Sequence, residues 1–288
     1  MIHQLDFNGL DKVDKAIMRL QTYEPEEGYY LCFSGGKDSC VIKALADMAG
    51  VKYDARYSVT SVDPPELVYF IKDKYPDVEF EYTRDKDGNR VTMWNLIPKK
   101  KMPPTRIARY CCAQLKETGG KGRLKITGVR WAESARRKRS HSEVTFMDKK
   151  AKTIISEELS EEDYSLTPQG GVVLRMDNRE NARIVEMCYK NHTTTINPII
   201  DWSDSEVWEF IREFSVPYCG LYDKGYKRLG CIGCPMSTRQ KEELDRYPKY
   251  KKLYLMAFEK MLKELDDKKL ITTWRTAQDV MEWWLNTY

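Results

Sequence analysis

The alternation of apolar and polar stretches in the first part of the chain predicts strands and helices in regular succession. Five consecutive apolar residues at 29–33 predict a buried strand. The other elements expected here are helices over 10–20, 39–49 and 66–74 and strands over 52–59 and 78–82. Because strands that alternate with helices form parallel sheets covered on both faces, the expected fold class is α/β, with a doubly wound, mostly parallel sheet.

The remainder of the chain gives a weaker pattern. Short strands are expected over 124–128 and 195–200, a helix over 203–214, and mostly helices over 238–288. Residues 84–110 are expected to be loose, and a short helix carries Cys111 and Cys112 after them. The expected domains are an α/β nucleotide-binding domain over 1–235, with an insertion near 145–178, and a helical C-terminal extension over 236–288.

The segment between the strand at 29–33 and the helix at 39–49 is typical of a phosphate-binding loop. Glycines let backbone N–H groups approach an anion, and a helix N-terminus favours negative charge. Lys37 adds a positive charge, and two serines add hydroxyl donors. The alternative is an ordinary strand–turn–helix connection with a polar N-cap. The spacing excludes the Walker A and dinucleotide patterns. The segment reads Ser34, Gly35, Gly36, Lys37, Asp38, Ser39.

Composition places the chain among water-soluble globular proteins. Its 288 residues are 41% hydrophobic and 32% charged, with a net charge of +4. No apolar run approaches the ~20 residues that span a bilayer, and the first residues do not resemble a signal peptide. We therefore expect a cytoplasmic protein without membrane association. The mild positive charge permits a nucleic-acid partner but does not indicate one.

The chain has eight cysteines, and in a reducing compartment disulfides are not expected. Cys231 and Cys234 are two residues apart, which lets both thiolates face one centre, and Cys111 and Cys112 form a second pair. Four thiolates suit zinc or an iron–sulfur cluster. The adjacent pair favours the cluster, because each thiolate can bind a different iron. Unrelated cysteines are the remaining alternative, and Cys219 is interpreted as structural or as a reserve ligand.

The phosphate loop resembles the PP-loop, Ser-Gly-Gly-x-Asp-Ser, of ATP pyrophosphatases in the adenine nucleotide alpha-hydrolase superfamily. The motifs after it resemble the phosphoadenosine phosphosulfate (PAPS) reductase family in their order. A Cys-Cys pair followed by Cys-x-x-Cys is similar to the [4Fe-4S] pattern of adenylyl-sulfate reductases. The other matching segments are 127–136, with Gly128, Arg130, Glu133 and Ser134; 197–208, with Asn197, Pro198 and Trp202; and 221–226.

Two departures from the sulfonucleotide reductases indicate ATP as the nucleotide. Those enzymes usually have a degenerate loop, whereas this loop is complete. They also use a nucleophilic cysteine near the C-terminus, whereas the last cysteine here is Cys234. The pattern looks most similar to cluster-bearing, ATP-cleaving members, such as the sulfur-activating component of DNA phosphorothioation systems. The resemblance implies a [4Fe-4S] cluster and ATP with Mg²⁺ as cofactors, and a desulfurase or thioredoxin as partner; it leaves an oligomer and a nucleic-acid partner open.

The expected chemistry is cleavage of the nucleotide at its alpha-phosphate in support of sulfur transfer. The loop N–H groups, Lys37 and the serines would hold the pyrophosphate leaving group. Asp38 would act on magnesium or serve as an N-cap, and Arg130 would reach a phosphate or sulfate or lie in solvent. Asp63 and Gly128 are further candidates for nucleotide contact. The rival functions are a sulfonucleotide reductase that uses an external thiol and a non-catalytic nucleotide sensor.

Overall fold

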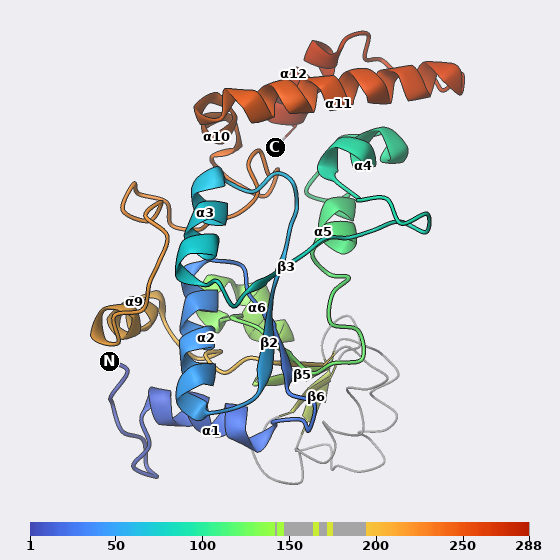
Figure 1. Cartoon of the computed structure of the whole chain (residues 1–288). Coiled ribbons are helices and arrows are strands. Elements are labelled where there is room, and N and C mark those ends of the chain that lie inside the picture. Colours follow the sequence, from blue (N-terminus) through green and yellow to red (C-terminus); the bar gives the residue numbers. More distant parts are fainter. Residues whose placement is uncertain (142, 147–163, 167–171, 175–193, 288) are drawn as a thin grey trace. The chain divides into compact units, whose positions relative to one another are not determined.

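The computed structural model describes residues 1–141, 143–146, 164–166, 172–174 and 194–287 (Figure 1). The chain forms two compact units, which are described separately. The first comprises Met1–Tyr57, Tyr69–Glu79 and Gly120–Tyr226, and the second comprises Ser58–Val68, Phe80–Gly119 and Lys227–Tyr288. This division differs from the expected boundary after residue 235, because two N-terminal segments belong with the C-terminal helices. Most of the insertion expected near 145–178 lies outside the described residues.

The strands form one sheet in the order β3-β2-β1-β4-β8-β5-β7-β6. The pairs β1–β2, β1–β4 and β4–β8 are parallel, whereas β5, β6 and β7 pair antiparallel at one edge. The expected α/β fold class is therefore confirmed, with parallel pairing in the part of the sheet that includes β1 and β4. The strands are β1 (Tyr29–Cys32), β2 (Tyr53–Ser58), β3 (Glu79–Glu81), β4 (Lys125–Ile126), β5 (Val144–Phe146), β6 (Tyr164–Leu166), β7 (Val172–Leu174) and β8 (Thr194–Ile196).

The strand order places the phosphate loop where the chain direction across the sheet reverses. β1 has β2 on one side and β4 on the other, so the connections leave β1 and β4 in opposite directions. Ligands of open α/β sheets bind beyond the carboxyl ends of strands at such a point. Gly128 follows β4 there, and a Cβ at this residue would lie 3.0 Å from Asp38 Cβ and 3.2 Å from the Asp38 carbonyl carbon. A glycine at this position is what lets the end of β4 approach α2.

Three helices of the first unit lie together, with α2 in contact with both α1 and α9 (Figure 1). α1 (Lys12–Thr22) and α9 (Asp204–Glu213) each begin with a capping box, in which the N-cap side chain and the third residue exchange hydrogen bonds. α2 (Lys37–Ala49) begins after Gly36 and ends at Gly50 in the left-handed conformation. The first unit also contains the short helices η1 (Trp131–Glu133) and α6 (Ala135–Ser140), whereas α5 (Tyr110–Leu115) belongs to the second unit and the residues of α3 (Pro65–Lys74) are divided between the two.

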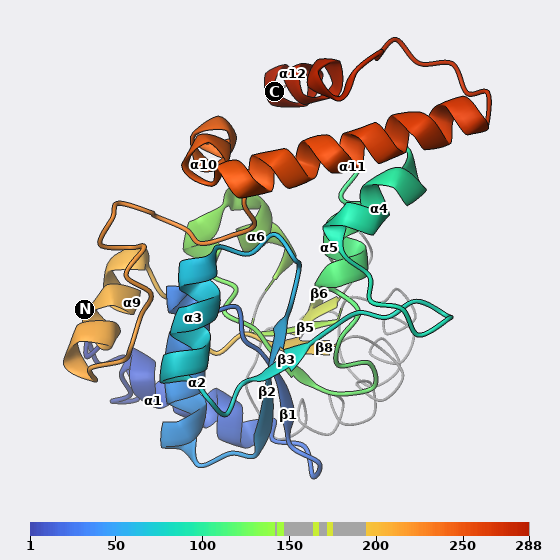
Figure 2. The same ribbon diagram turned by 45° about the horizontal axis from the view of Figure 1, so that its top comes forward.

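The second unit is built around a long helix, α11 (Pro248–Asp267), which contacts α4 (Met93–Lys100), α10 (Gln240–Arg246) and α12 (Ala277–Asn286) (Figure 2). Its core combines residues that are far apart in sequence, including Val62, Ile97, Phe258 and Trp284. α4 lies where the sequence predicted a loose segment, so that prediction is wrong. The helix starts with a capping box at Thr92, and Pro98 lies in its last turn, next to Lys99 and Lys100.

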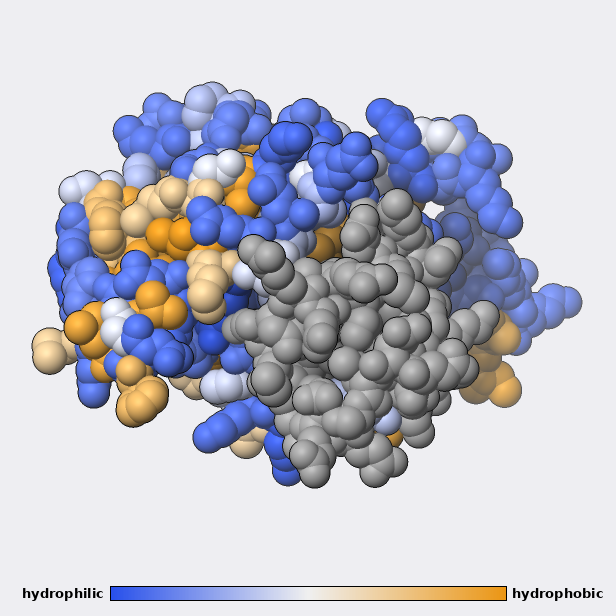
Figure 3. Space-filling model, turned by 90° about the horizontal axis from the view of Figure 1, so that it is seen from below, coloured by the Kyte–Doolittle hydropathy of each residue, from blue (hydrophilic) through white to orange (hydrophobic). Residues whose placement is uncertain are grey.

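The described helices are all too short or too polar to span a bilayer. On the face shown in Figure 3, apolar side chains gather on one side and are interrupted by polar ones. The N-terminal segment contributes exposed apolar residues, among them Met1, Leu5 and Phe7. Polar residues elsewhere on this face agree with the charged content of 32%.

Replacement of Trp284 by alanine should destabilise the second unit strongly. The indole is 1% exposed, its Nε1 donates to the Pro104 carbonyl at 2.7 Å, and its ring contacts Tyr254 and Phe258. Truncation of a buried aromatic side chain costs about 3–5 kcal/mol, and urea denaturation followed by circular dichroism measures the loss. Trp283→Ala is the matched control, because Trp283 is 37% exposed and should lose about 1 kcal/mol. Equal losses would contradict the assigned core.

Replacement of Gly128 by alanine should destabilise the first unit, because the added methyl would meet the backbone of α2. Overpacking of this kind typically costs about 1–3 kcal/mol. Gly230→Ala provides the control, since a Cβ there meets no heavy atom within 4 Å. The midpoints of chemical denaturation compare the two variants, and a Gly128→Ala protein as stable as Gly230→Ala would show that β4 does not approach α2 so closely.

Candidate functional site

The phosphate loop joins β1 to α2 in the first unit. Gly35 has φ +71°, and Gly36 is the extended N-cap of α2. The Ser34 hydroxyl donates to Ser39 Oγ at 3.2 Å and accepts from the Gly36 N–H at 3.4 Å. The Ser39 hydroxyl donates to the Gly36 carbonyl at 2.8 Å. Hydrogen bonds from its own hydroxyl groups therefore stabilise the loop, and the 13-residue helix α2 begins directly after it.

Lys37 is the first residue of α2 and its side chain is only 4% exposed. Its Nζ lies 3.4 Å from Asp38 Oδ2, 3.0 Å from Asp204 Oδ1 and 5.9 Å from the centre of the Tyr222 ring. Its backbone N–H donates to the Tyr222 hydroxyl at 2.9 Å. Both the charge and the backbone donor of Lys37 thus meet oxygen acceptors inside the first unit.

Arg130 follows β4 and is 2% exposed. Its Nε donates to Asp38 Oδ1 at 2.7 Å, its Nη1 to the Trp202 carbonyl at 3.2 Å and its Nη2 to Asp204 Oδ1 at 3.0 Å. Partial desolvation opposes ionisation of the largely exposed Asp204 carboxylate, but the hydrogen bonds from Lys37 and Arg130 outweigh it and hold the pKa of Asp204 below the usual aspartate value. One guanidinium thereby links the end of β4 to the first turns of α2 and α9.

The structure brings together most of the residues that the sequence predicted for nucleotide binding. Lys37, Asp38 and Arg130 are in direct contact, and Gly128 lies against Asp38. Two of the alternatives left open are wrong. Asp38 is not an N-cap, because Gly36 has that role, and Arg130 is buried rather than a solvated surface residue.

Asp63 belongs to the second unit, and its carboxylate serves a turn there. Its Oδ2 accepts from the Thr60 N–H at 2.8 Å, and its Oδ1 accepts from the Thr60 hydroxyl at 2.7 Å. Its carbonyl accepts from the Tyr250 hydroxyl at 3.0 Å. Contact of Asp63 with a nucleotide stays a prediction.

Sequence reasoning missed Asp204 and Tyr222, which both contact Lys37. Signals for them were present. Asp204 directly follows Ser203, the N-cap of a helix that the sequence did predict. Tyr222 lies in the segment 221–226, which the resemblance had singled out. Nothing local indicates that either side chain turns toward the phosphate loop, because the contacts join residues more than 160 positions apart.

The four cysteines predicted as metal ligands all belong to the second unit. Cys111 and Cys112 lie on α5, whereas Cys231 and Cys234 lie in a turn where the Cys234 N–H donates to the Cys231 carbonyl at 3.2 Å. The Ile232 N–H donates to the Val62 carbonyl at 2.8 Å, and the Tyr254 hydroxyl donates to the Ile232 carbonyl at 3.0 Å. The turn is thus fixed to the core between its two cysteines.

The four thiols influence one another electrostatically. A hydrogen bond between Cys111 and Cys112 raises the pKa of Cys111 and lowers that of Cys112, and Arg109, whose Nη2 lies 3.6 Å from Cys112 Sγ, adds to the lowering. Burial raises the pKa of Cys234, and the electrostatic influence of the nearby Cys231 raises it further. Cys231 also raises the pKa of Lys116, a cation that sequence reasoning missed.

Among the described residues, no three Cys, His, Asp or Glu side chains converge on the position of a single metal ion. A tetrahedral zinc site would place thiolates about 3.8 Å apart, given Zn–S bonds of ~2.3 Å. A [4Fe-4S] cluster binds each thiolate at a different iron, so its four thiolates can lie farther apart than those of a zinc site. The chemistry of the donors, four thiols flanked by Arg109 and Lys116, fits such a cluster. Cys219 is 1% exposed and belongs to the first unit, in agreement with its structural interpretation.

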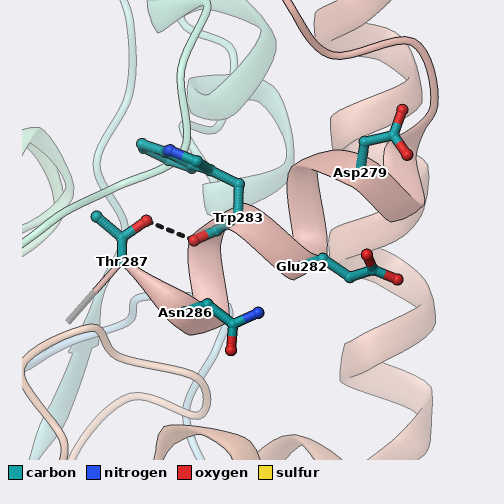
Figure 4. A pocket seen from close by; sticks show the side chains of 5 residues that line it. All are labelled: Asp279, Glu282, Trp283, Asn286 and Thr287. Atoms are coloured by element: carbon teal, nitrogen blue, oxygen red, sulfur yellow. Dashed lines mark hydrogen bonds between the residues drawn. The ribbon is translucent and has the colours of Figure 1, made fainter.

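A shallow hollow on α12 contains none of the predicted site residues (Figure 4). It is lined by Asp279, Glu282, Trp283, Asn286 and Thr287, and the Thr287 hydroxyl donates to the Trp283 carbonyl. Its lining offers carboxylates but no cation for a phosphate and no nucleophile. This hollow therefore gives no support to a second phosphate site on α12.

Comparisons with known proteins agree with these motifs. The chain is 24% identical over 252 residues to an adenosine 5'-phosphosulfate reductase of Staphylococcus epidermidis, covering 81% of each chain. It is 43% identical over 54 residues to the reductase of the same name from Allochromatium vinosum, covering 19% of this chain and 21% of that protein. A phosphoadenylyl-sulfate reductase structure from Candida auris is similar at a TM-score of 0.43 and 14% identity, covering 79% of this chain and 96% of that one.

The profile of the phosphoadenosine phosphosulfate reductase domain matches residues 28–237, which include the phosphate loop, Arg130, Asp204 and all four cysteines of the predicted metal site. The match extends over well more than half of the 288 residues. The chain therefore belongs to the phosphoadenosine phosphosulfate reductase domain family.

Proposed function

We propose that this member of the family binds ATP at the phosphate loop and acts at its alpha-phosphate, releasing pyrophosphate in support of sulfur transfer. The observation that carries the proposal is the complete loop at the N-terminus of α2, with the buried cations Lys37 and Arg130 beside it. Two buried cations, backbone N–H groups and two serine hydroxyls suit a polyphosphate, whose negative charge spreads over many oxygens.

The residues of the site would act mainly on the leaving group. Attack at the alpha-phosphate develops charge on the departing pyrophosphate, and preorganised donors that meet this charge lower the barrier. Lys37 and the loop N–H groups would bind the pyrophosphate oxygens. Asp38, whose carboxylate accepts from Arg130 at 2.7 Å, would bind the Mg²⁺ that accompanies ATP. An adenine nucleotide as the substrate is consistent with membership of this family.

The cysteine set would hold a [4Fe-4S] cluster through Cys111, Cys112, Cys231 and Cys234. Bound there with each iron ligated by a cysteine, the cluster would supply electrons, and Arg109 and Lys116 would balance its negative charge. A desulfurase or thioredoxin is the sulfur or thiol partner that such chemistry requires. A nucleic acid as acceptor stays a prediction without an observation in its favour.

A second candidate is sulfonucleotide reduction. It is favoured by the relatives named adenosine 5'-phosphosulfate reductase, one of which matches 81% of this chain. The buried cations would then bind the sulfate end of the nucleotide, and an external thiol such as thioredoxin would take part in releasing sulfite. Separate anaerobic incubations decide between the two, one with ATP and two with adenylyl sulfate or PAPS together with reduced thioredoxin as the two-electron donor: pyrophosphate from ATP supports the first, and sulfite from a sulfonucleotide supports the second.

Replacement of Lys37 together with Ser34 by alanine should lower pyrophosphate release from ATP by about 10²-fold or more, because the leaving group loses a cation and a hydroxyl donor. A coupled pyrophosphate assay measures the rate, and circular dichroism confirms the fold. Lys74→Ala is the control of matched charge, since the Lys74 side chain is 54% exposed and pairs with Asp73 on the surface of α3. Unchanged turnover in the double variant would contradict the role of the loop.

Replacement of Cys112 or Cys231 by serine should remove the bound iron, because a cluster of four thiolate ligands is weakened by loss of one of them. Iron and acid-labile sulfide in anaerobically purified protein measure the occupancy. Cys32→Ser serves as the control, because Cys32 lies on β1 in the first unit and is not one of the proposed ligands. Stoichiometric zinc without iron in the unaltered protein would contradict the cluster.

A further inference from the structure

Two side chains of the first unit, Asp204 and Tyr222, contact the same donors that a bound phosphate would use. Asp204 Oδ1 lies 3.0 Å from Lys37 Nζ and 3.0 Å from Arg130 Nη2. The Tyr222 hydroxyl accepts from the backbone N–H of Lys37 at 2.9 Å. A carboxylate on two cations and a hydroxyl on a helix N-terminal N–H are the same kinds of contact that phosphate oxygens make.

The two oxygens come from segments that contact each other. Asp204 is the first residue of α9, and Trp208 lies one turn further along the same helix. The ring of Trp208 meets the rings of Tyr222 and Tyr218 edge to face, with centroids 5.2 Å apart in both pairs. Figures 1 and 2 both show the segment after α9 returning beside this helix. A movement of α9 would therefore carry Tyr222 with it.

The exposed fractions of the three side chains indicate that Asp204, rather than Lys37 or Arg130, can move out of the contact. The Asp204 side chain is 65% exposed, whereas Lys37 and Arg130 are 4% and 2% exposed. Arg130 also keeps Asp38 and the Trp202 carbonyl as acceptors when Asp204 moves. The cations are thus fixed parts of the site, and the Asp204 carboxylate can turn into water without leaving a buried charge of its own unpaired.

We propose that Asp204 and Tyr222 are internal ligands of the nucleotide site, which the phosphates of the substrate must displace in order to bind. This inference rests on the proposed function only in taking the loop as a polyphosphate site. The internal carboxylate is tethered at a high effective concentration, so it lowers the affinity of every anion that needs Lys37 and Arg130. Anions with few oxygens are excluded first, because they replace fewer of the displaced contacts.

Inorganic pyrophosphate is the probe, and isothermal titration of the full-length protein measures its Kd. Asp204→Asn should bind pyrophosphate about threefold to tenfold more tightly, since two partly exposed ion pairs no longer compete. Tyr222→Phe keeps the ring contact with Trp208 and frees the Lys37 N–H, so its Kd should fall about twofold to tenfold. Asp73→Asn removes the same charge from an exposed position on α3, and its Kd should change by less than about twofold.

Equal or weaker binding by Asp204→Asn would overturn the inference, because a residue that supports the site cannot be its competitor. Asp204→Ser gives the same reading if the asparagine variant does not fold, since serine suits the first turn of a helix. Pyrophosphate binding needs no turnover. If the variants bind pyrophosphate more tightly but the unaltered protein does not cleave ATP, the proposed reaction is refuted and the internal ligands are supported. If the unaltered protein cleaves ATP but the variants bind pyrophosphate with unchanged affinity, the reaction is supported and the internal ligands are refuted.

Discussion

The guanidinium of Arg130 lies almost entirely out of water, and a buried cation persists only where acceptors surround it. Asp38, at the start of α2, and the Trp202 carbonyl and Asp204, at the start of α9, supply these acceptors from two separate segments. Gly128 lets β4 approach α2 closely, and this approach brings Arg130 within reach of Asp38. The positions of the phosphate loop, the start of α9 and the end of β4 are all tied to this one ion.

The two chemical sites follow the same electrostatic rule with opposite signs. At the phosphate loop, the cations Lys37 and Arg130 are matched by carboxylates. At the cysteine set, the thiols are accompanied by the cations Arg109 and Lys116. In each case the protein itself supplies the counter-charge. A phosphate that binds at the phosphate loop has to replace the carboxylates that pair with Lys37 and Arg130. A cluster bound by the four cysteines could instead remain beside Arg109 and Lys116.

The sequence predicted the elements that local patterns determine, and it failed where distant contacts decide. β1, the loop and α2 were predicted because apolar residues, glycines and helix formers follow one another directly. α4 was missed because Pro98 and the lysines after it are typical of loops, although a capping box at Thr92 starts the helix. Arg130 was identified as a site residue, but its burial depends on Asp38 and Asp204, which no local pattern connects to it.

The second unit collects its core from three stretches of chain, and this affects how the protein can form. Val62 and Ile97 lie within the first hundred residues, whereas Phe258 and Trp284 lie in the last part of the sequence. Contacts across so many residues are slow to form, because a long loop must be closed before any burial is gained. During synthesis the early segments must wait, with their apolar side chains exposed, until residue 284 has left the ribosome. Until then the apolar side chains around Val62 and Ile97 can associate with other chains, so the order in which the segments are synthesised creates a risk of aggregation.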